Sequence, residues 1–202
     1  MDNAFTGPRA AWVERRTGET DVRLGLRLDG TGSARVETGV GFFDHMLTAF
    51  ARHGFFDLDV RVQGDLHVDS HHTVEDTGLC LGQALREALG DKGGIRRIGS
   101  ASVPMDEVLV HAVVDLSGRP FLNYRLQPAP QLIGNFDPVL AEEFFRAFAF
   151  RAGMNLHILQ WAGGNSHHLI EAAFKAVARA LDEATAPEPR LQGPLSTKGS
   201  LD

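Results

Sequence analysis

Two short segments of this 202-residue chain carry the same set of side chains that can bind metals. A histidine pair followed by a glutamate occurs at residues 71–75 (HHTVE) and again at residues 167–171 (HHLIE). Imidazole nitrogens and carboxylate oxygens are ligands for divalent ions such as manganese, iron, zinc and nickel. One short motif carries a real risk of a false match, but a repeated motif predicts two related metal sites.

Helical spacing explains how each segment could bind metal. Each residue advances a helix by 100°, so His71 and Glu75 lie on one face and His72 points to the side. One face could therefore chelate one ion while the adjacent imidazole reaches a second ion. Ser70 and Ser166 precede the two segments and are predicted N-caps, which places both ligand sets in the first turn of a helix.

A helix upstream of each segment adds one more candidate ligand. Residues 44–51 (DHMLTAFA) align with residues 142–149 (EEFFRAFA), and His45 then corresponds to Glu143. The candidate metal ligands are His45, His71, His72, Glu75, Glu143, His167, His168 and Glu171. Eight groups leave open positions on two six-coordinate ions, and open positions are typical of catalytic rather than structural metal sites.

The elements that must position these ligands also repeat. The helices that follow the two segments share apolar positions along one stripe, which is typical of a helix packed on a sheet. Alternating apolar residues predict strands near residues 22–28, 56–62, 108–116 and 156–158. We predict an α+β fold with an internal duplication of two similar halves, each a mostly antiparallel β-sheet with two helices on one face.

Glycines and prolines mark the boundaries of these halves. The segment 90–94 (GDKGG) predicts the joint, with the first half at residues 1–92 and the second half at residues 93–186. The tail at residues 187–202 is rich in proline and glycine, which excludes a regular helix or a central strand. We expect this tail to be a loop that is ordered only where it docks.

Composition excludes several classes of protein. No apolar run approaches the roughly 20 residues of a membrane span, and the first residues lack a secretory signal, so we expect a cytoplasmic protein without a membrane partner. A net charge of −6 without a long basic segment argues against nucleic acid as a partner. The single cysteine, Cys80, offers no disulfide or thiolate pair, so nitrogen and oxygen must bind any metal.

The chain resembles the imidazoleglycerol-phosphate dehydratase family in stretches spread over almost its whole length. The matching stretches, in family order, are 16–20 (RTGET), 41–47 (GFFDHML), 69–76 (DSHHTVED), 95–97 (IRR), 117–120 (SGRP), 165–168 (NSHH) and 196–199 (STKG). The resemblance implies the duplicated α+β fold and two Mn²⁺ ions per active site. It also implies a closed homo-oligomer of about 24 copies, whose active sites take ligands from neighbouring subunits.

The activity that the resemblance implies is that of a carbon–oxygen lyase (hydro-lyase) of histidine biosynthesis. It converts imidazole glycerol phosphate to imidazole acetol phosphate and water. No carbonyl group acidifies the hydrogen that is lost, so the imidazole ring must activate the substrate. The family mechanism passes through a metal-bound imidazolate and a diazafulvene-like intermediate, using the electrostatics by which metals lower the pKa of bound water.

The resemblance also implies roles for individual residues. Glu19 is the expected general acid/base, and the ligands Glu75 and Glu171 are expected to take part in catalysis. Asp106 matches a position near the substrate, although a structural role in a turn is an alternative. The residues that match the phosphate-binding cluster are Arg97, Arg119, Ser196 and Lys198. Arginine suits this role because its planar guanidinium can donate two parallel hydrogen bonds to phosphate.

The clearest departure from the family is Glu143, where the family carries histidine. A carboxylate could still bind manganese, although it adds negative charge, and Glu142 is an alternative ligand. Two other functions fit the metal ligands. A binuclear metallohydrolase of phosphate esters would release free phosphate. A metal-storage or metal-sensing oligomer would have no role for Glu19 or for the phosphate-binding cluster.

Overall fold

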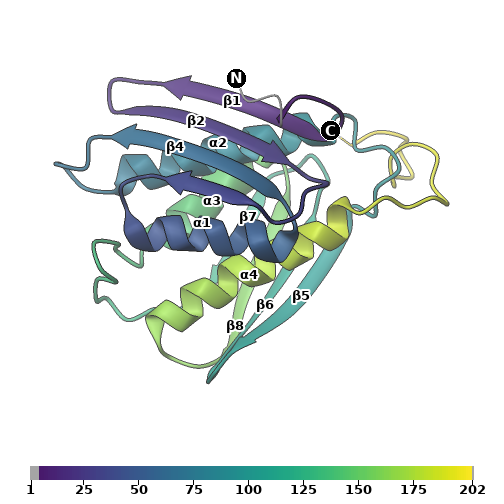
Figure 1. Ribbon diagram of the computed structural model, residues 1–202. Coiled ribbons are helices and arrows are strands. Elements are labelled where there is room, and N and C mark those ends of the chain that lie inside the picture. Colours follow the sequence, from purple (N-terminus) through teal and green to yellow (C-terminus); the bar gives the residue numbers. More distant parts are fainter. Residues whose placement is uncertain (1–4, 202) are drawn as a thin grey trace.

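The computed structural model describes residues 5–201, which form two four-stranded sheets with helices between them (Figure 1). The first sheet has the order β1-β2-β4-β3, with bounds Ala10–Arg16, Thr20–Arg27, Asp57–Gly64 and Ala34–Glu37. The second has the order β5-β6-β8-β7, with bounds Ile98–Met105, Val108–Asp115, Asn155–Ala162 and Phe121–Arg125. In each sheet two neighbouring pairs are antiparallel and one pair is parallel.

Two helices cover the inner face of each sheet. Helices α1 (Gly41–Gly54) and α2 (His71–Leu89) pack on the first sheet, and α3 (Leu140–Ala152) and α4 (Ser166–Thr185) pack on the second. Across the middle of the molecule α1 packs on α4 and α2 packs on α3 (Figure 1). The predicted α+β fold with two similar, mostly antiparallel halves is therefore confirmed.

Apolar periodicity explains why these segments form a shared core. In β6 every second side chain, from Val108 to Val114, is buried against the helices, as the strand pattern predicted. Between the helices, the Phe144 ring stacks on Phe174 with centroids 5.0 Å apart. Burial of each such aromatic side chain contributes about 2 to 3 kcal/mol. The two halves consequently share one continuous hydrophobic core.

Glycines allow α2 and α3 to pack closely. A Cβ atom on Gly78 would lie 2.7 Å from the carbonyl oxygen of Phe144, and one on Gly82 would lie 2.6 Å from that of Phe148. A larger residue would therefore force the helices apart. These contacts also show that α2 and α3 run in the same direction, which brings their first turns to the same end of the molecule.

The capping predictions were partly wrong. Ser70 occupies the N-cap position of α2, but its side chain makes no capping bond. Ser166 is the first residue of α4 rather than its N-cap. The N-cap is Asn165, whose side-chain oxygen accepts hydrogen bonds from the backbone N–H groups of His167 and His168 at 3.0 and 3.2 Å. The Asn165 amide oxygen thus pairs two N–H groups of the first turn that have no partner within the helix, which is the role of an N-cap residue. Ser166 already lies inside the helix and does not take this role.

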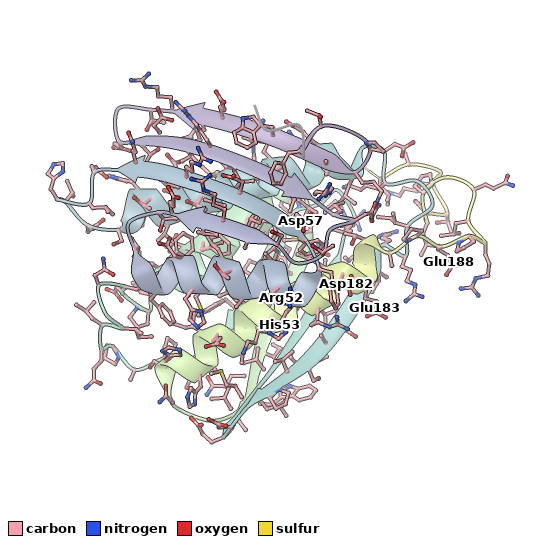
Figure 2. All side chains as sticks on the ribbon, in the orientation of Figure 1. Arg52, His53, Asp57, Asp182, Glu183 and Glu188 are labelled. Carbon is pink, nitrogen blue, oxygen red and sulfur yellow. The ribbon has the colours of Figure 1, made fainter. Side chains whose placement is uncertain are left out.

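The tail docks on the segment that joins the two halves. The Gly94 N–H donates to the carbonyl of Gly193 at 2.9 Å, and the Glu188 N–H donates to that of Gly94 at 2.8 Å. Figure 2 shows Glu188 beyond the end of α4, where Asp182 and Glu183 lie. The division into residues 1–92, 93–186 and 187–202 stays a prediction, and residues 1–4 and 202 lie outside the described part.

None of the helices within residues 5–201 combines the length and the apolar content that a membrane span requires.

Candidate functional site

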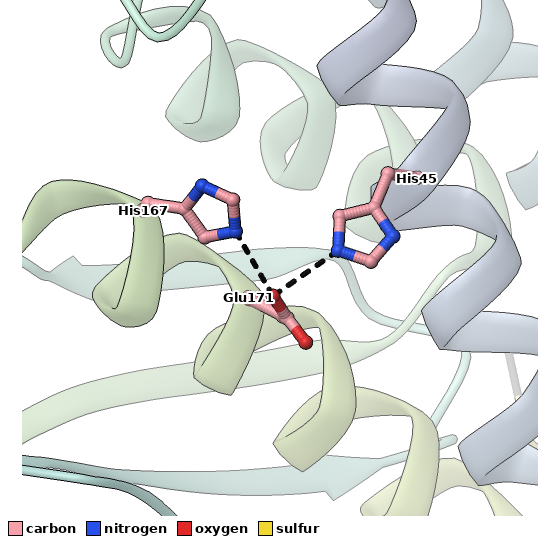
Figure 3. A group of neighbouring side chains, drawn as sticks. All are labelled: His45, His167 and Glu171. Atoms are coloured by element: carbon pink, nitrogen blue, oxygen red, sulfur yellow. Dashed lines mark hydrogen bonds and ion pairs between the residues drawn. The ribbon is translucent and has the colours of Figure 1, made fainter.

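Three predicted ligands meet where α1 lies beside the first turns of α4 (Figure 3). The Nε2 atoms of His45 and His167 each lie 3.2 Å from Oε2 of Glu171. Both imidazoles are about half-exposed, whereas the Glu171 side chain is buried. His45 comes from the first half of the chain and the other two residues from the second. The halves therefore build this cluster together.

Lys175, one turn further along α4, forms an ion pair with Glu171 and stabilises its ionised form. Nζ of Lys175 lies 2.5 Å from Oε1 of Glu171. Burial alone would raise the pKa of Glu171, but hydrogen bonds and charge from Lys175 and then His45 outweigh burial and hold that pKa below its usual value. Glu171 is therefore an anion at neutral pH. The sequence reasoning missed Lys175, although its spacing of four residues from Glu171 is a recognisable signal.

The corresponding predicted ligands of the first half lie further apart. Nε2 of His71 lies 3.7 Å from Oε2 of Glu75, one turn later on α2. Glu143 lies on the neighbouring helix α3, but its carboxylate faces Arg146 at 3.6 Å, and Glu142 pairs with the same arginine at 2.7 Å. The three-ligand groups found within residues 5–201 do not include Glu143. Its role as a ligand stays a prediction.

The second histidine of the first pair lies between two carboxylates. Nδ1 of His72 is 3.0 Å from Asp65, which precedes α2, and Nε2 is 3.7 Å from Glu19 in the turn between β1 and β2. The hydrogen bond to Asp65 is the main reason why the pKa of His72 is raised. The same bond lowers the pKa of Asp65. The sequence reasoning selected Glu19 and missed Asp65.

The second half repeats this arrangement at the turn between β5 and β6. Nδ1 of His168 lies 3.0 Å from Glu107, and Nε2 lies 3.9 Å from Asp106. These three residues form the second group that could hold a metal ion. The hydrogen bond to His168 is the main cause that lowers the pKa of Glu107 to about 2. The sequence reasoning missed Glu107, although it adjoins Asp106.

The donor set fits a divalent cation. The candidate ligand atoms that lie together are imidazole nitrogens and carboxylate oxygens. Cys80 is buried in the core, and burial raises the pKa of its thiol to about 12. Nitrogen and oxygen donors without thiolate suit manganese and related ions. The imidazoles of His45 and His167 are about half-exposed, so they can be reached from solvent.

The predicted phosphate-binding residues line a separate pocket of about 590 Å³, together with the tail. They are Arg97, Arg119, Ser196 and Lys198. Arg97 donates two hydrogen bonds to Asp115, at 2.7 and 3.0 Å, and one to the carbonyl of Leu195 at 2.6 Å. Within residues 5–201, Arg119 and Lys198 form no ion pair with a carboxylate, so their charge is available to an anion.

The cluster of His45, His167 and Glu171 and the pocket of predicted phosphate-binding residues lie at opposite ends of α4. The Arg97 N–H donates to the carbonyl of Ala184 in the last turn, whereas Glu171 lies near the start of the helix. Ala184 follows Glu171 by 13 residues, which corresponds to about 20 Å along the helix axis. Figure 1 shows this end of α4 beside the tail. A small phosphorylated ligand therefore cannot contact both regions of one chain.

A family model and several curated proteins that are similar to this chain carry the same name. The family model described as imidazoleglycerol-phosphate dehydratase matches residues 38–181. A protein of that name from Lachnoclostridium phytofermentans is 59% identical over 194 residues, covering 96% of this chain and 99% of the relative. Another from Gluconacetobacter diazotrophicus is 58% identical over 202 residues, covering 100% of both chains.

Two solved structures are also similar. The imidazoleglycerol-phosphate dehydratase from Staphylococcus aureus superposes with a TM-score of 0.80 at 40% identity, covering 88% of this chain and 99% of that chain. The enzyme from Pyrococcus furiosus, solved in complex with (S)-C348, superposes with a TM-score of 0.81 at 38% identity. It covers 94% of this chain and 100% of its own.

Proposed function

Because the chain belongs to the imidazoleglycerol-phosphate dehydratase family, we propose that it removes water from imidazole glycerol phosphate to give imidazole acetol phosphate. It is then a hydro-lyase, and we place it in histidine biosynthesis in the cytoplasm. The observation that carries this proposal is the meeting of His45, His167 and Glu171, from both halves, in a chain that also has a cationic pocket for phosphate.

We infer that the enzyme uses two manganese ions in each active site. His45, His167 and Glu171 would hold one ion, and His71 and Glu75 would contribute to the other. The second histidines, His72 and His168, and Glu143 complete the proposed ligand set. When bound, such cations withdraw electron density from the imidazole ring of the substrate and make it easier to deprotonate.

Residues of the chain itself provide the other requirements of the reaction. Glu19 is half-exposed, lies 3.7 Å from Nε2 of His72, and could transfer a proton at the carbon chain of a bound substrate. Asp106 lies in the same relation to His168. Arg119 and Lys198 would bind the phosphate group, which the reaction leaves attached to the carbon chain. The route through an imidazolate and a diazafulvene-like intermediate stays a prediction.

We also propose that the active site is shared between subunits. The separation of about 20 Å along α4 means that one chain cannot present its metal ligands and its phosphate pocket to the same substrate. A second copy must supply one of the two regions. A closed homo-oligomer meets this requirement for every site, and about 24 copies is the expected assembly.

The direct test is an assay with purified protein, Mn²⁺ and imidazole glycerol phosphate. The proposal predicts a ketone product that keeps its phosphate. Release of free phosphate would instead support a binuclear metallohydrolase. Tight Mn²⁺ binding without any turnover would support a metal-storage or metal-sensing protein.

A further inference from the structure

We propose that Asp65 and Glu107 are positioning residues that orient His72 and His168 for metal binding. Each carboxylate lies 3.0 Å from Nδ1 of its histidine. Because a carboxylate can only accept, a neutral imidazole beside it carries its single N–H on Nδ1, and Nε2 is then the ligand atom. This inference rests on the metal centre of the proposed function, and goes beyond it by giving a role to two carboxylates outside the proposed ligand set.

In the first half, Asp65 is fixed on the side of His72 that faces away from Glu19. Its two carboxylate oxygens lie 3.2 and 3.0 Å from Nδ1 of His72. The side chain is only 17% exposed. The Asp65 backbone N–H also donates to the carbonyl of Glu19 at 3.1 Å. A backbone hydrogen bond therefore connects Asp65 to Glu19, the proposed general acid/base.

In the second half, both oxygens of Glu107 are held. Oε2 lies 3.0 Å from Nδ1 of His168, and Oε1 accepts a hydrogen bond from the Asn165 N–H at 3.0 Å. Asn165 in turn caps the helix that carries His168. This chain of contacts links the hairpin turn, the helix start and the imidazole, so the ring has little freedom to rotate.

The internal duplication indicates that this arrangement has a function. β2 and β6 are both eight residues long, and Glu19 and Glu107 occupy the same position, directly before each strand. Yet Glu19 faces Nε2 of its histidine and Glu107 faces Nδ1. In the first half the Nδ1 contact comes from Asp65 after β4, and Gly163 stands at the corresponding place after β8.

Both histidines therefore have a carboxylate at Nδ1, but the two carboxylates, Asp65 and Glu107, do not occupy corresponding positions in the repeat. A contact inherited from a duplicated ancestor would use corresponding residues, so simple inheritance does not explain this one. A neutral imidazole carries one N–H, and the hydrogen bond made by one nitrogen determines which nitrogen is free for metal. Asp65 and Glu107 therefore select the same tautomer in both halves, and leave Glu19 and Asp106 free for the substrate.

The test compares two substitutions at each position. Asp65→Ala and Glu107→Ala remove the acceptor, whereas Asp65→Asn and Glu107→Gln keep an oxygen that can accept from Nδ1 but remove the charge. Mn²⁺ affinity is measured without substrate, from the electron paramagnetic resonance signal of free Mn²⁺. We expect the alanine variants to bind about 10- to 100-fold more weakly and the amide variants to keep most of the affinity.

Glu87→Gln is the matched control, because Glu87 is an exposed carboxylate of α2 that pairs only with Gln83 in the described chain. It should bind Mn²⁺ like the wild type. Wild-type affinity in both alanine variants would overturn the inference. So would an equal loss in the amide and alanine variants, because that result would show a general effect of charge rather than of orientation.

Two further readouts keep the result unambiguous. Thermal unfolding of the metal-free variants checks that they fold, and if Asp65→Ala does not fold, the Glu107 pair decides the question. A wild-type protein that binds no Mn²⁺ would overturn the proposed metal centre itself. Wild-type Mn²⁺ binding that is unchanged in the variants would overturn only the positioning role.

Discussion

Nε2 of His45 lies 3.2 Å from Oε2 of Glu171, although 126 residues separate them in the sequence. The contact joins α1 of the first half to α4 of the second and brings His167 to the same carboxylate oxygen. Glu171 is buried and ionised, so it places a negative charge between the two imidazoles. The duplicated fold therefore has a chemical consequence, because neither half contains all three of these side chains.

Replacing Glu171 by Gln should weaken Mn²⁺ binding by at least about 10-fold, because it removes the anion between the two imidazoles. Metal analysis after dialysis against a weak chelator measures the loss. Glu183→Gln is the control, because Glu183 lies on the same helix but accepts from the Ser100 N–H instead. Retention of full metal content by Glu171→Gln would show that this cluster is not a metal site.

Replacing Lys198 by Ala should raise the KM for imidazole glycerol phosphate with little change in bound metal. A charged hydrogen bond to phosphate contributes about 1.5 to 3 kcal/mol, which corresponds to a change of about 10- to 100-fold. Arg190→Ala is the control, because Arg190 is a tail cation that already pairs with Glu188 at 2.6 Å. An unchanged KM would remove the tail from the substrate site.

Two defective variants should restore activity to one another if active sites are shared. Glu171→Gln damages the metal ligands, and the double variant Arg119→Ala, Lys198→Ala damages the phosphate pocket. Random mixing in equal amounts would leave about a quarter of the sites with both regions intact. Turnover of co-expressed variants is compared with the two variants mixed without subunit exchange. No gain on co-expression, or an active monomer in gel filtration, would contradict shared sites.

A structural prediction concerns Asp57 at the start of β4 (Figure 2). Burial alone would raise its pKa, but hydrogen bonds from Arg27 and from the backbone of Thr31 and Ser33 hold it below the usual value. Its stabilising effect should therefore be complete above about pH 4 and lost as the pH falls through the lowered folded-state pKa. Asp57→Asn should cost about 1 to 3 kcal/mol at pH 7.

Urea unfolding of the metal-free protein at pH 7 and near pH 3 measures this dependence. The difference between the wild type and Asp57→Asn should shrink at the lower pH. Asp29→Asn is the control, because Asp29 is an exposed partner of Arg9 and should contribute at most about 1 kcal/mol. An equal cost of Asp57→Asn at both pH values would show that the charge of Asp57 does not stabilise the fold.

The local features of the site could be predicted from the sequence because helical spacing determines them. His71 and Glu75 lie one turn apart and face one another, and the strands around Val110 and Leu24 follow their apolar alternation. The partner of each helix could not be predicted. An apolar stripe shows which face is buried but not against which helix, and α1 packs on α4 of the other half.

Contacts made by loops were also beyond prediction. Asp65 and Glu107 lie in connections without periodicity, and the direction of each carboxylate depends on how the hairpin and the helix start meet. Glu143 is a different case, and its role as a ligand stays a prediction. Its alignment with His45 suggested a ligand, but in the single chain it faces Arg146, three residues later on its own helix. Local ion pairs can thus compete with a role implied by a repeat.

Elemental analysis of the active protein, combined with turnover after chelation, tests most directly whether the enzyme depends on metal. We predict two manganese ions per active site, loss of dehydration when a chelator removes them, and recovery when Mn²⁺ is returned. Full turnover in material that contains no divalent ion would contradict a reaction in which histidines and glutamates from both halves act through bound metal.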